Sequence, residues 1–199
     1  MTDPQQLWML VGGNGAGKST FFRLYLESKG IQFINADNIA KTLGHENQER
    51  LAYQAAKVAG QIREDFLLKG LSFCFETVFS HPSKIDFMAD AKARGYEVIL
   101  VFIHLDGDQL NQARVEQRVN EGGHNVPTEK IISRIPRTLN HVRQALPLAD
   151  AAYILDNSLR DDPYQQVAVL KDGRIMLLKK PLPRWAEEVL IDYLADYCS

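Results

Sequence analysis

Short apolar runs alternate with stretches of mixed polarity along most of the chain. The runs have the length and composition of strands, and the stretches between them carry apolar residues at helical spacing or end at glycine. Such alternation favours a three-layer α/β fold, with a mainly parallel five-stranded sheet and helices on both faces. The predicted strands are Leu7–Val11, Ile31–Ile34, Leu71–Phe79, Tyr96–Leu105 and Ala151–Leu155.

Helices are expected between these strands and near the end of the chain. Pro136 falls inside one of them and should kink or split it, because proline lacks the amide hydrogen that a helix interior needs. The predicted helices are 20–29, 38–43, 47–69, 83–94, 108–121, 128–146 and 184–197.

Two further β-type runs flank Asp172-Gly173, which is a strong signal for a hairpin turn. The hairpin and the final helix occupy about residues 164–197, and we expect them to cover the sheet. Neither a repeat nor a long linker interrupts the sequence, so we expect one domain over residues 1–199.

The composition narrows the class of protein. The 199 residues are 45% hydrophobic and 24% charged, with a formal net charge of −2, as in soluble globular domains. This charge gives no general attraction for polyanions, so nucleic acid and membrane surfaces are not expected partners. No apolar stretch could span a bilayer and no signal-peptide pattern is found, so we expect a cytoplasmic protein. Cys74 lies in a predicted strand and is expected in the core.

A phosphate-binding loop follows the first predicted strand. Residues 12–19 read Gly-Gly-Asn-Gly-Ala-Gly-Lys-Ser, which satisfies the pattern G-x-x-x-x-G-K-[ST] between a strand and a helix. In such a loop the backbone amides surround a triphosphate, Lys18 reaches the β- and γ-phosphates, and the Ser19 hydroxyl ligates Mg²⁺. The sequence therefore predicts binding of ATP with Mg²⁺. The predicted nucleotide-binding residues are Gly12, Gly13, Asn14, Gly15, Ala16, Gly17, Lys18, Ser19, Thr20 and Arg114.

Polar residues follow the other predicted strands at the edge where ligands bind in open parallel sheets. Asp37 is the candidate general base, since phosphoryl transfer to an alcohol needs a carboxylate that accepts the hydroxyl proton. The alternative for Asp37 is a helix N-cap for residues 38–43. His104, Asp106 and 156–158 also lie at this edge, and His104 is the weaker catalytic candidate because a strand-end histidine is more often structural.

Glu76 interrupts a run that is otherwise apolar, which indicates a polar cleft rather than the core. It could bind hydroxyl groups of the acceptor or a water on Mg²⁺, and the alternative is a buried, ion-paired glutamate. The predicted acceptor-binding residues are Glu76, Thr77, His124 and Arg137.

Basic residues gather between positions 114 and 143. Arg114 and Arg118 share one predicted helix face, and Arg134, Arg137 and His141 share another. Two glycines at 122–123 separate the helices. We expect a helical lid at about 109–146 that closes arginines over the triphosphate. The alternative is a solvated basic face paired with nearby glutamates.

Taken together, these segments resemble the zeta-toxin-like P-loop kinases. The matching segments are 12–19, Ile34-Asn35-Ala36-Asp37, Phe75-Glu76-Thr77, Arg118-Val119, Gly122-Gly123-His124-Asn125-Val126-Pro127, Ile131, Arg134, Arg137 and Asp156-Asn157-Ser158. They extend over roughly residues 7–158. The chain is short beside the best-known toxins, and its Gly-Gly-His segment differs from theirs.

The resemblance implies a P-loop kinase that uses ATP and Mg²⁺. Toxin members phosphorylate a sugar hydroxyl of a uridine-diphosphate-linked amino sugar and are inhibited by a partner antitoxin. By motif match, Lys18 holds phosphates, Ser19 the metal and Asp37 acts as base. The lid arginines that bind the γ-phosphate correspond to Arg118 and Arg134.

The predicted function is a Mg²⁺- and ATP-dependent kinase with a small-molecule hydroxyl acceptor. A transporter-type ATPase shares the spelling of the phosphate loop, but the chain has neither a Leu-Ser-Gly-Gly-Gln-like signature nor an apolar strand ending in Asp-Glu. Two more functions fit such a loop: a nucleic-acid end kinase, and a nucleotide-dependent binding module without phosphoryl transfer.

Overall fold

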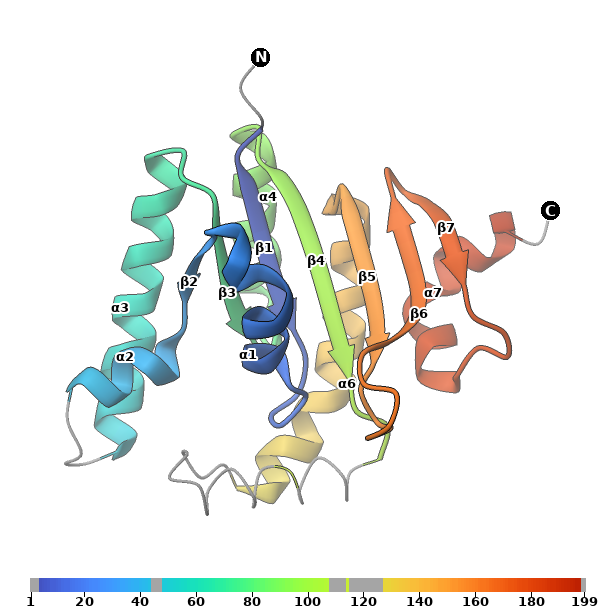
Figure 1. Ribbon diagram of the computed structural model, residues 1–199, viewed down its shortest axis with the longest axis horizontal. Coiled ribbons are helices and arrows are strands. Elements are labelled where there is room, and N and C mark those ends of the chain that lie inside the picture. The colour runs from blue at the N-terminus through green and yellow to red at the C-terminus, as the bar shows by residue number, and fades with distance from the viewer. Residues whose placement is uncertain (1–3, 44–47, 108–113, 115–126, 198–199) are drawn as a thin grey trace.

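Seven strands form a single sheet in the computed structural model, which describes residues 4–43, 48–107, 114 and 127–197 (Figure 1). Their order across the sheet is β2-β3-β1-β4-β5-β6-β7. The first five strands in this order pair in parallel, which confirms the predicted parallel core. The strands are β1 (Gln6–Val11), β2 (Gln32–Ile34), β3 (Phe73–Thr77), β4 (Glu97–His104), β5 (Ala151–Asp156), β6 (Gln165–Lys171) and β7 (Arg174–Leu178).

The C-terminal hairpin corrects one expectation. Instead of covering the sheet, it lengthens the sheet at its edge, because β6 pairs antiparallel with β5, and β7 with β6. Asp172 has a positive φ of 48° and Gly173 one of 71° at its turn, as a tight hairpin requires. The final helix, α7 (Arg184–Tyr197), packs on the sheet through Ala186, Val189 and Leu190.

Helices cover both faces, and the alternation of side chains along the strands explains why. On β1, Leu7, Met9 and Val11 enter one buried cluster, while Leu10 enters the other. The first cluster lies beneath four helices and the second beneath the helix that follows the phosphate loop. The four helices are α3 (Gln48–Leu68), α4 (Ser83–Ala93), α6 (Thr128–Ala145) and α7.

The helix after the phosphate loop is less regular than its sequence predicts. Its α-helical part, α1 (Lys18–Phe21), continues as a π-helical turn over Phe22–Leu26 and ends in a 3₁₀ turn over Glu27–Lys29. Pro136 lies within α6, which continues through it, so the predicted split does not occur. The helix predicted at 108–121 falls outside the described residues except for Arg114.

Two smaller observations complete the fold. Cys74 is fully buried on β3, and burial raises the pKa of its thiol, as expected for a core residue. Among the described residues, no helix combines the length and the apolar character that crossing a bilayer demands.

Candidate active site

The phosphate loop lies between β1 and α1 and approaches the rest of the protein very closely. The amide of Gly12 donates to the carbonyl of Thr77 at 3.2 Å, which joins the loop to the end of β3. A Cβ on Gly12 would lie 2.2 Å from the carbonyl oxygen of Ile103 on β4. Glycine is therefore required here by space, because any side chain would displace the loop from the sheet.

Lys18 is directed into the loop. Its side chain is buried, and its Nζ donates to the carbonyls of Gly12 at 2.9 Å and Gly13 at 2.8 Å. The loop thus holds an ammonium group at its centre, where it can attract the terminal phosphates of a nucleotide.

Ser19 and Glu76 meet beside the loop. The hydroxyl of Ser19 donates to Oε2 of Glu76 at 2.6 Å. The parallel register aligns Leu10 of β1 with Glu76 of β3, so the sheet itself brings the carboxylate to the start of α1. Glu76 is half-buried and accepts from a hydroxyl, which differs from the buried ion pair considered as its alternative.

This pair of oxygen ligands fits Mg²⁺. The ion prefers hard oxygen donors, and usually takes one or two from the protein and the rest from water and phosphate oxygens. Within the described part of the chain, no three His, Cys, Asp or Glu side chains form a metal-binding group. The structure therefore fits a magnesium ion held largely by a nucleotide, rather than a metal site built by protein alone.

Asn157 and Tyr164 hold the back of the loop. Asn157 donates from Nδ2 to the Ala16 carbonyl at 2.9 Å, and the hydroxyl of Tyr164 donates to the Gly17 carbonyl at 2.9 Å. A Cβ on Gly17, whose φ is 93°, would lie 2.6 Å from Nδ2 of Asn157 and 2.9 Å from the hydroxyl of Tyr164. These contacts fix the conformation of the loop from the C-terminal part of the chain.

Sequence reasoning does not find Tyr164. Asn157 is among the polar residues expected after the fifth strand, but without a role, and Tyr164 lies in a connection that carries no motif. The Tyr164 amide donates to Oδ1 of Asn157 at 3.3 Å, and its φ of 57° turns the chain before β6. Only the fold brings this connection to the phosphate loop.

An open groove of about 510 Å³ extends from the loop toward Tyr164. Arg114 stands at this groove, where its guanidinium donates to the Asn157 carbonyl at 2.9 Å. Residues that line the groove include Gly15, Lys18, Ser19, Glu76, Arg114 and Tyr164. The groove thus joins the predicted phosphate and metal ligands in one space.

Asp37 lies at the end of β2, in the first turn of α2 (Ala36–Leu43). Its side chain is exposed. The alternative role of helix cap belongs to Asn35 instead, whose buried side chain accepts from the Asn38 amide at 3.1 Å. The helix therefore starts two residues earlier than predicted, and Asp37 is not needed to cap it.

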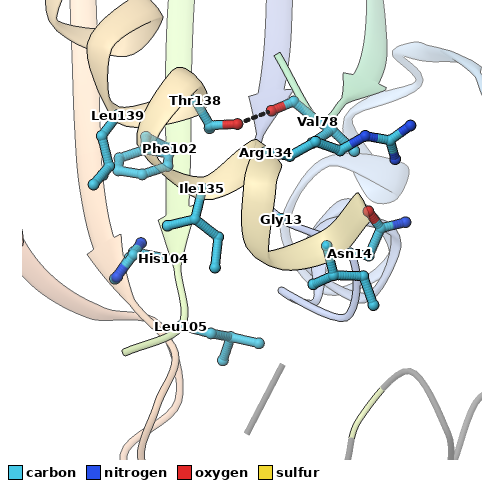
Figure 2. Close-up of a pocket in the computed structure, with 11 residues that line it drawn as sticks. Gly13, Asn14, Val78, Phe102, His104, Leu105, Arg134, Ile135, Thr138 and Leu139 are labelled. Atoms are coloured by element: carbon cyan, nitrogen blue, oxygen red, sulfur yellow. Dashed lines mark hydrogen bonds between the residues drawn. The ribbon is translucent and has the colours of Figure 1, made fainter. Parts of the chain in front are cut away.

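The α6 helix carries the described part of the predicted lid. Arg134 lines a small cavity together with Gly13 and Asn14 of the phosphate loop (Figure 2). One turn further along α6, the Thr138 hydroxyl donates to the Val78 carbonyl at 2.8 Å. Arg137 is exposed, and its Nε donates to the Ser133 carbonyl of its own helix.

Thr77 and His104 have structural positions. The Thr77 hydroxyl accepts from the Phe79 amide at 3.0 Å and so shapes the turn after β3. The His104 ring lies 4.3 Å from that of Trp185, in the core behind the loop. Burial lowers the pKa of His104 to about 4, against the opposing effect of Asp106 and Asp156. This imidazole is neutral at pH 7, which agrees with its expected structural role.

Arg118, His124 and the glycines at 122–123 lie outside the described residues. Closure of the predicted lid and the roles of these two side chains stay predictions. The described structure thus brings together Lys18, Ser19, Glu76, Arg114 and, from α6, Arg134 around one loop.

A family model described as an AAA domain matches residues 7–137. The chain belongs to this family. The matched segment contains the phosphate loop, Asp37, Glu76 and Arg134.

Three solved structures share the fold. One, from the PezAT toxin–antitoxin system of Streptococcus pneumoniae, has a TM-score of 0.64 and 18% identity, and covers 96% of this chain and 85% of that one. The AvrRxo1-ORF1:-ORF2 structure with ATP has a TM-score of 0.72 and 16% identity, covering 87% of this chain and 60% of that one. A shikimate kinase of Acinetobacter baumannii, in complex with shikimate, has a TM-score of 0.51 and 20% identity, covering 78% and 85%. The chain thus has a P-loop fold, which it shares with a protein of a toxin–antitoxin system and with a shikimate kinase.

Proposed function

We propose that the chain is a Mg²⁺- and ATP-dependent kinase that transfers the γ-phosphate to a hydroxyl group of a small molecule. The observation that carries the proposal is the contact of Ser19 with Glu76, 2.6 Å apart, beside a loop with Lys18 at its centre. A hydroxyl and a carboxylate beside a phosphate loop are the protein ligands that a Mg²⁺–nucleotide complex uses.

In this proposal the loop binds the triphosphate. Lys18 leaves the carbonyls of Gly12 and Gly13 and binds phosphate oxygens, and the loop amides donate to the β-phosphate. Arg114 binds the nucleotide from the rim of the groove. Ser19 and Glu76 would hold Mg²⁺, which would supply positive charge to neutralise the phosphates. Binding of ATP is supported by the family match and by the fold neighbour that contains ATP.

Asp37 is proposed as the general base. It follows β2, whose neighbour in the sheet, β3, ends at Glu76 and Thr77, so both carboxylates come from adjacent strand ends. An exposed carboxylate at this edge can accept the proton of an acceptor hydroxyl as the phosphate is transferred. Glu76 and Thr77, with Arg137 and His124, are proposed to contact the acceptor.

Arg118 and Arg134 are proposed as the lid arginines that bind the γ-phosphate. Arg134 already lines a cavity with Gly13 and Asn14 of the loop. A guanidinium there stabilises the charge that develops on the transferred group, because it stays ionised and can donate two hydrogen bonds.

The acceptor and partners are proposed by likeness alone. A nucleotide-linked amino sugar is the acceptor suggested by the zeta-toxin-like fold, and the toxin–antitoxin neighbour suggests an antitoxin protein as partner. We propose that the protein acts in the cytoplasm, where ATP and Mg²⁺ are present.

The test uses purified protein, Mg²⁺, ATP labelled with ¹⁸O in its γ-phosphate, and a metabolite extract. Mass spectrometry should find a metabolite that gains one labelled phosphate. Lys18→Ala should abolish transfer, and Asp37→Ala should abolish it while binding of ATP stays within about twofold. Asp65→Ala, an exposed carboxylate on α3, is the matched control and should transfer normally.

Two outcomes contradict the proposal. ATP turnover at the same rate with and without the extract, with no phosphorylated metabolite, would indicate an ATPase instead. Binding of ATP without turnover under any condition would indicate a nucleotide-dependent binding module.

A further inference from the structure

Two half-buried cations lie on the face of β3 opposite to the Ser19–Glu76 contact. Arg63 comes from α3 and Lys84 from the first turn of α4. The guanidinium carbon of Arg63 lies 4.9 Å from the centroid of the Phe75 ring. Because side chains alternate along a strand, Phe75 faces the α3 and α4 side, and Glu76 the opposite side. The two cations therefore lie on one face of the end of β3, and the Ser19–Glu76 contact lies on the other face.

These cations have no carboxylate partner in the described part of the chain. Neither Arg63 nor Lys84 has an ion pair or a side-chain hydrogen bond there, whereas Lys92 of α4 and Lys69, which follows α3 directly, are each paired with an aspartate. Lys69 binds Asp65 on α3, and Lys92 at the end of α4 binds Asp150. The difference is not explained by solvent, since Arg63 and Lys84 are half-buried.

The electrostatics agree with this geometry. Burial lowers the pKa of Lys84, and the charge of Arg63 lowers it further. Burial also lowers the pKa of Arg63, with Glu64 of the same helix opposing the effect. Two like charges in a partly desolvated place destabilise one another unless an anion joins them.

The pair is also close to the proposed transfer site in the fold. Lys84 follows β3 by a short connection, and Asp37 follows the neighbouring strand β2. The α3 helix, which carries Arg63, packs against α2, which carries Asp37. A small molecule with its hydroxyl at Asp37 can therefore extend along the end of β3 toward Arg63 and Lys84.

We propose that Arg63 and Lys84 form an anion subsite for the acceptor, so that the acceptor carries an oxyanion group away from its reacting hydroxyl. This inference rests on the proposed kinase function and adds the chemical class of its substrate. A phosphate group neutralises both cations, because it has a charge between about −1.5 and −2 at pH 7. A planar guanidinium and an ammonium together supply donors to several of its oxygens. A carboxylate would neutralise only one of them.

The test first occupies the phosphate loop, so that it cannot itself bind the probe. The full chain is saturated with Mg²⁺ and a non-hydrolysable ATP analogue, then treated with an acylating reagent that labels deprotonated lysines. Mass spectrometry measures the labelling rate of Lys84 with inorganic phosphate, acetate or chloride at equal ionic strength. Phosphate is expected to slow labelling of Lys84 at least about threefold relative to chloride, and acetate less.

Variants connect this protection to the pair. Arg63→Met should remove the protection of Lys84 by phosphate. Phosphate binding to the Lys84 variants is measured as the rise in melting temperature that phosphate causes in the nucleotide-bound protein. Lys84→Arg, which keeps the charge, should keep this rise, and Lys84→Met should lose it. Lys57→Met, an exposed cation on α3, is the matched control and should behave like the wild type.

Absence of protection in the wild type would overturn the inference, as would equal protection of Lys57 and Lys84. Equal effects of acetate and phosphate would show that the subsite does not prefer phosphate, and would overturn the assignment of a phosphate group to the acceptor. Failure of the proposed function is separate, because it would appear as no binding of the analogue or no transfer to any metabolite.

Discussion

The hydroxyl of Tyr164 donates a hydrogen bond to the carbonyl of Gly17, although 147 positions separate the two residues. The same carbonyl accepts from the Phe21 amide at 2.8 Å, which is the first hydrogen bond of the helix after the loop. The phenol and the helix thus hold one peptide group from two directions. Because that peptide group joins Gly17 to Lys18, its orientation sets the direction in which the Lys18 side chain leaves the backbone.

Tyr164→Phe tests this relationship. The change removes one hydrogen bond but keeps the ring, so we expect a loss of about 1 kcal/mol. If the phenol holds the loop in its nucleotide-binding conformation, this loss appears as about fivefold weaker binding of Mg²⁺–ATP in isothermal titration calorimetry. Tyr153→Phe, on β5 near the same buried cluster, is the control and should bind like the wild type. Equal affinities of all three proteins would show that the contact does not serve binding.

Gly17→Ala should be far more severe. A methyl group there would meet Asn157 and Tyr164 at less than 3 Å, on a residue with a φ of 93°. We expect loss of measurable ATP binding and a drop of at least about 2 kcal/mol in the free energy of unfolding. Gly30→Ala is the matched control, since its φ is 71° but no atom lies within 4 Å of the new methyl. It should cost about 1 kcal/mol of stability and leave the affinity for ATP unchanged.

Glu76→Gln should change the requirement for magnesium. The amide keeps the size of the side chain, but a neutral oxygen is a weaker ligand for a hard cation. We expect a rise of at least about tenfold in the Mg²⁺ concentration that gives half-maximal ATP turnover. Glu187→Gln, an exposed glutamate on α7, should keep the wild-type requirement. An unchanged magnesium titration in Glu76→Gln would remove Glu76 from the metal site.

His104 predicts a pH dependence of stability. Burial lowers its pKa from 6.5 to about 4 in the folded state. Between these two values the unfolded chain binds the proton and the folded chain does not, so stability falls as pH falls through this window. From pH 6.5 to pH 5 the loss is about 2 kcal/mol. Urea unfolding at pH 6.5 and pH 5 measures this loss. The free energy of unfolding of His104→Gln should not show it, while His81→Gln should show it as the wild type does. The same loss in all three proteins would contradict the assignment.

Much of the fold was predictable because local patterns decide it. The five parallel strands follow from apolar runs that must be buried on both faces, and the hairpin follows from the turn at Asp172-Gly173. The place of the hairpin was not predictable, since a sequence with two β-type runs fits a layer over the sheet as well as a continuation of it. Only the pairing of β6 with β5 distinguishes these two arrangements.

The site was predictable where residues lie close in sequence or follow strands. The loop motif led to Lys18 and Ser19, and the position of Glu76 in an apolar run indicated a polar cleft, which its contact with Ser19 supports. The roles of Asn35 and Tyr164 were not predictable. A helix cap depends on where the helix begins, to within one or two residues. The contact of Tyr164 with Gly17 joins residues 147 positions apart, which no local pattern indicates.

The family match ends at residue 137, yet both side chains that hold the loop from behind, Asn157 and Tyr164, come later. A protein cut to the matched segment would keep the entire phosphate-loop motif while losing the supports for Ala16 and Gly17. The ability to bind a nucleotide is thus shared between the matched segment and the chain that follows it, and truncation for crystallography or fusion should preserve at least the chain through β6.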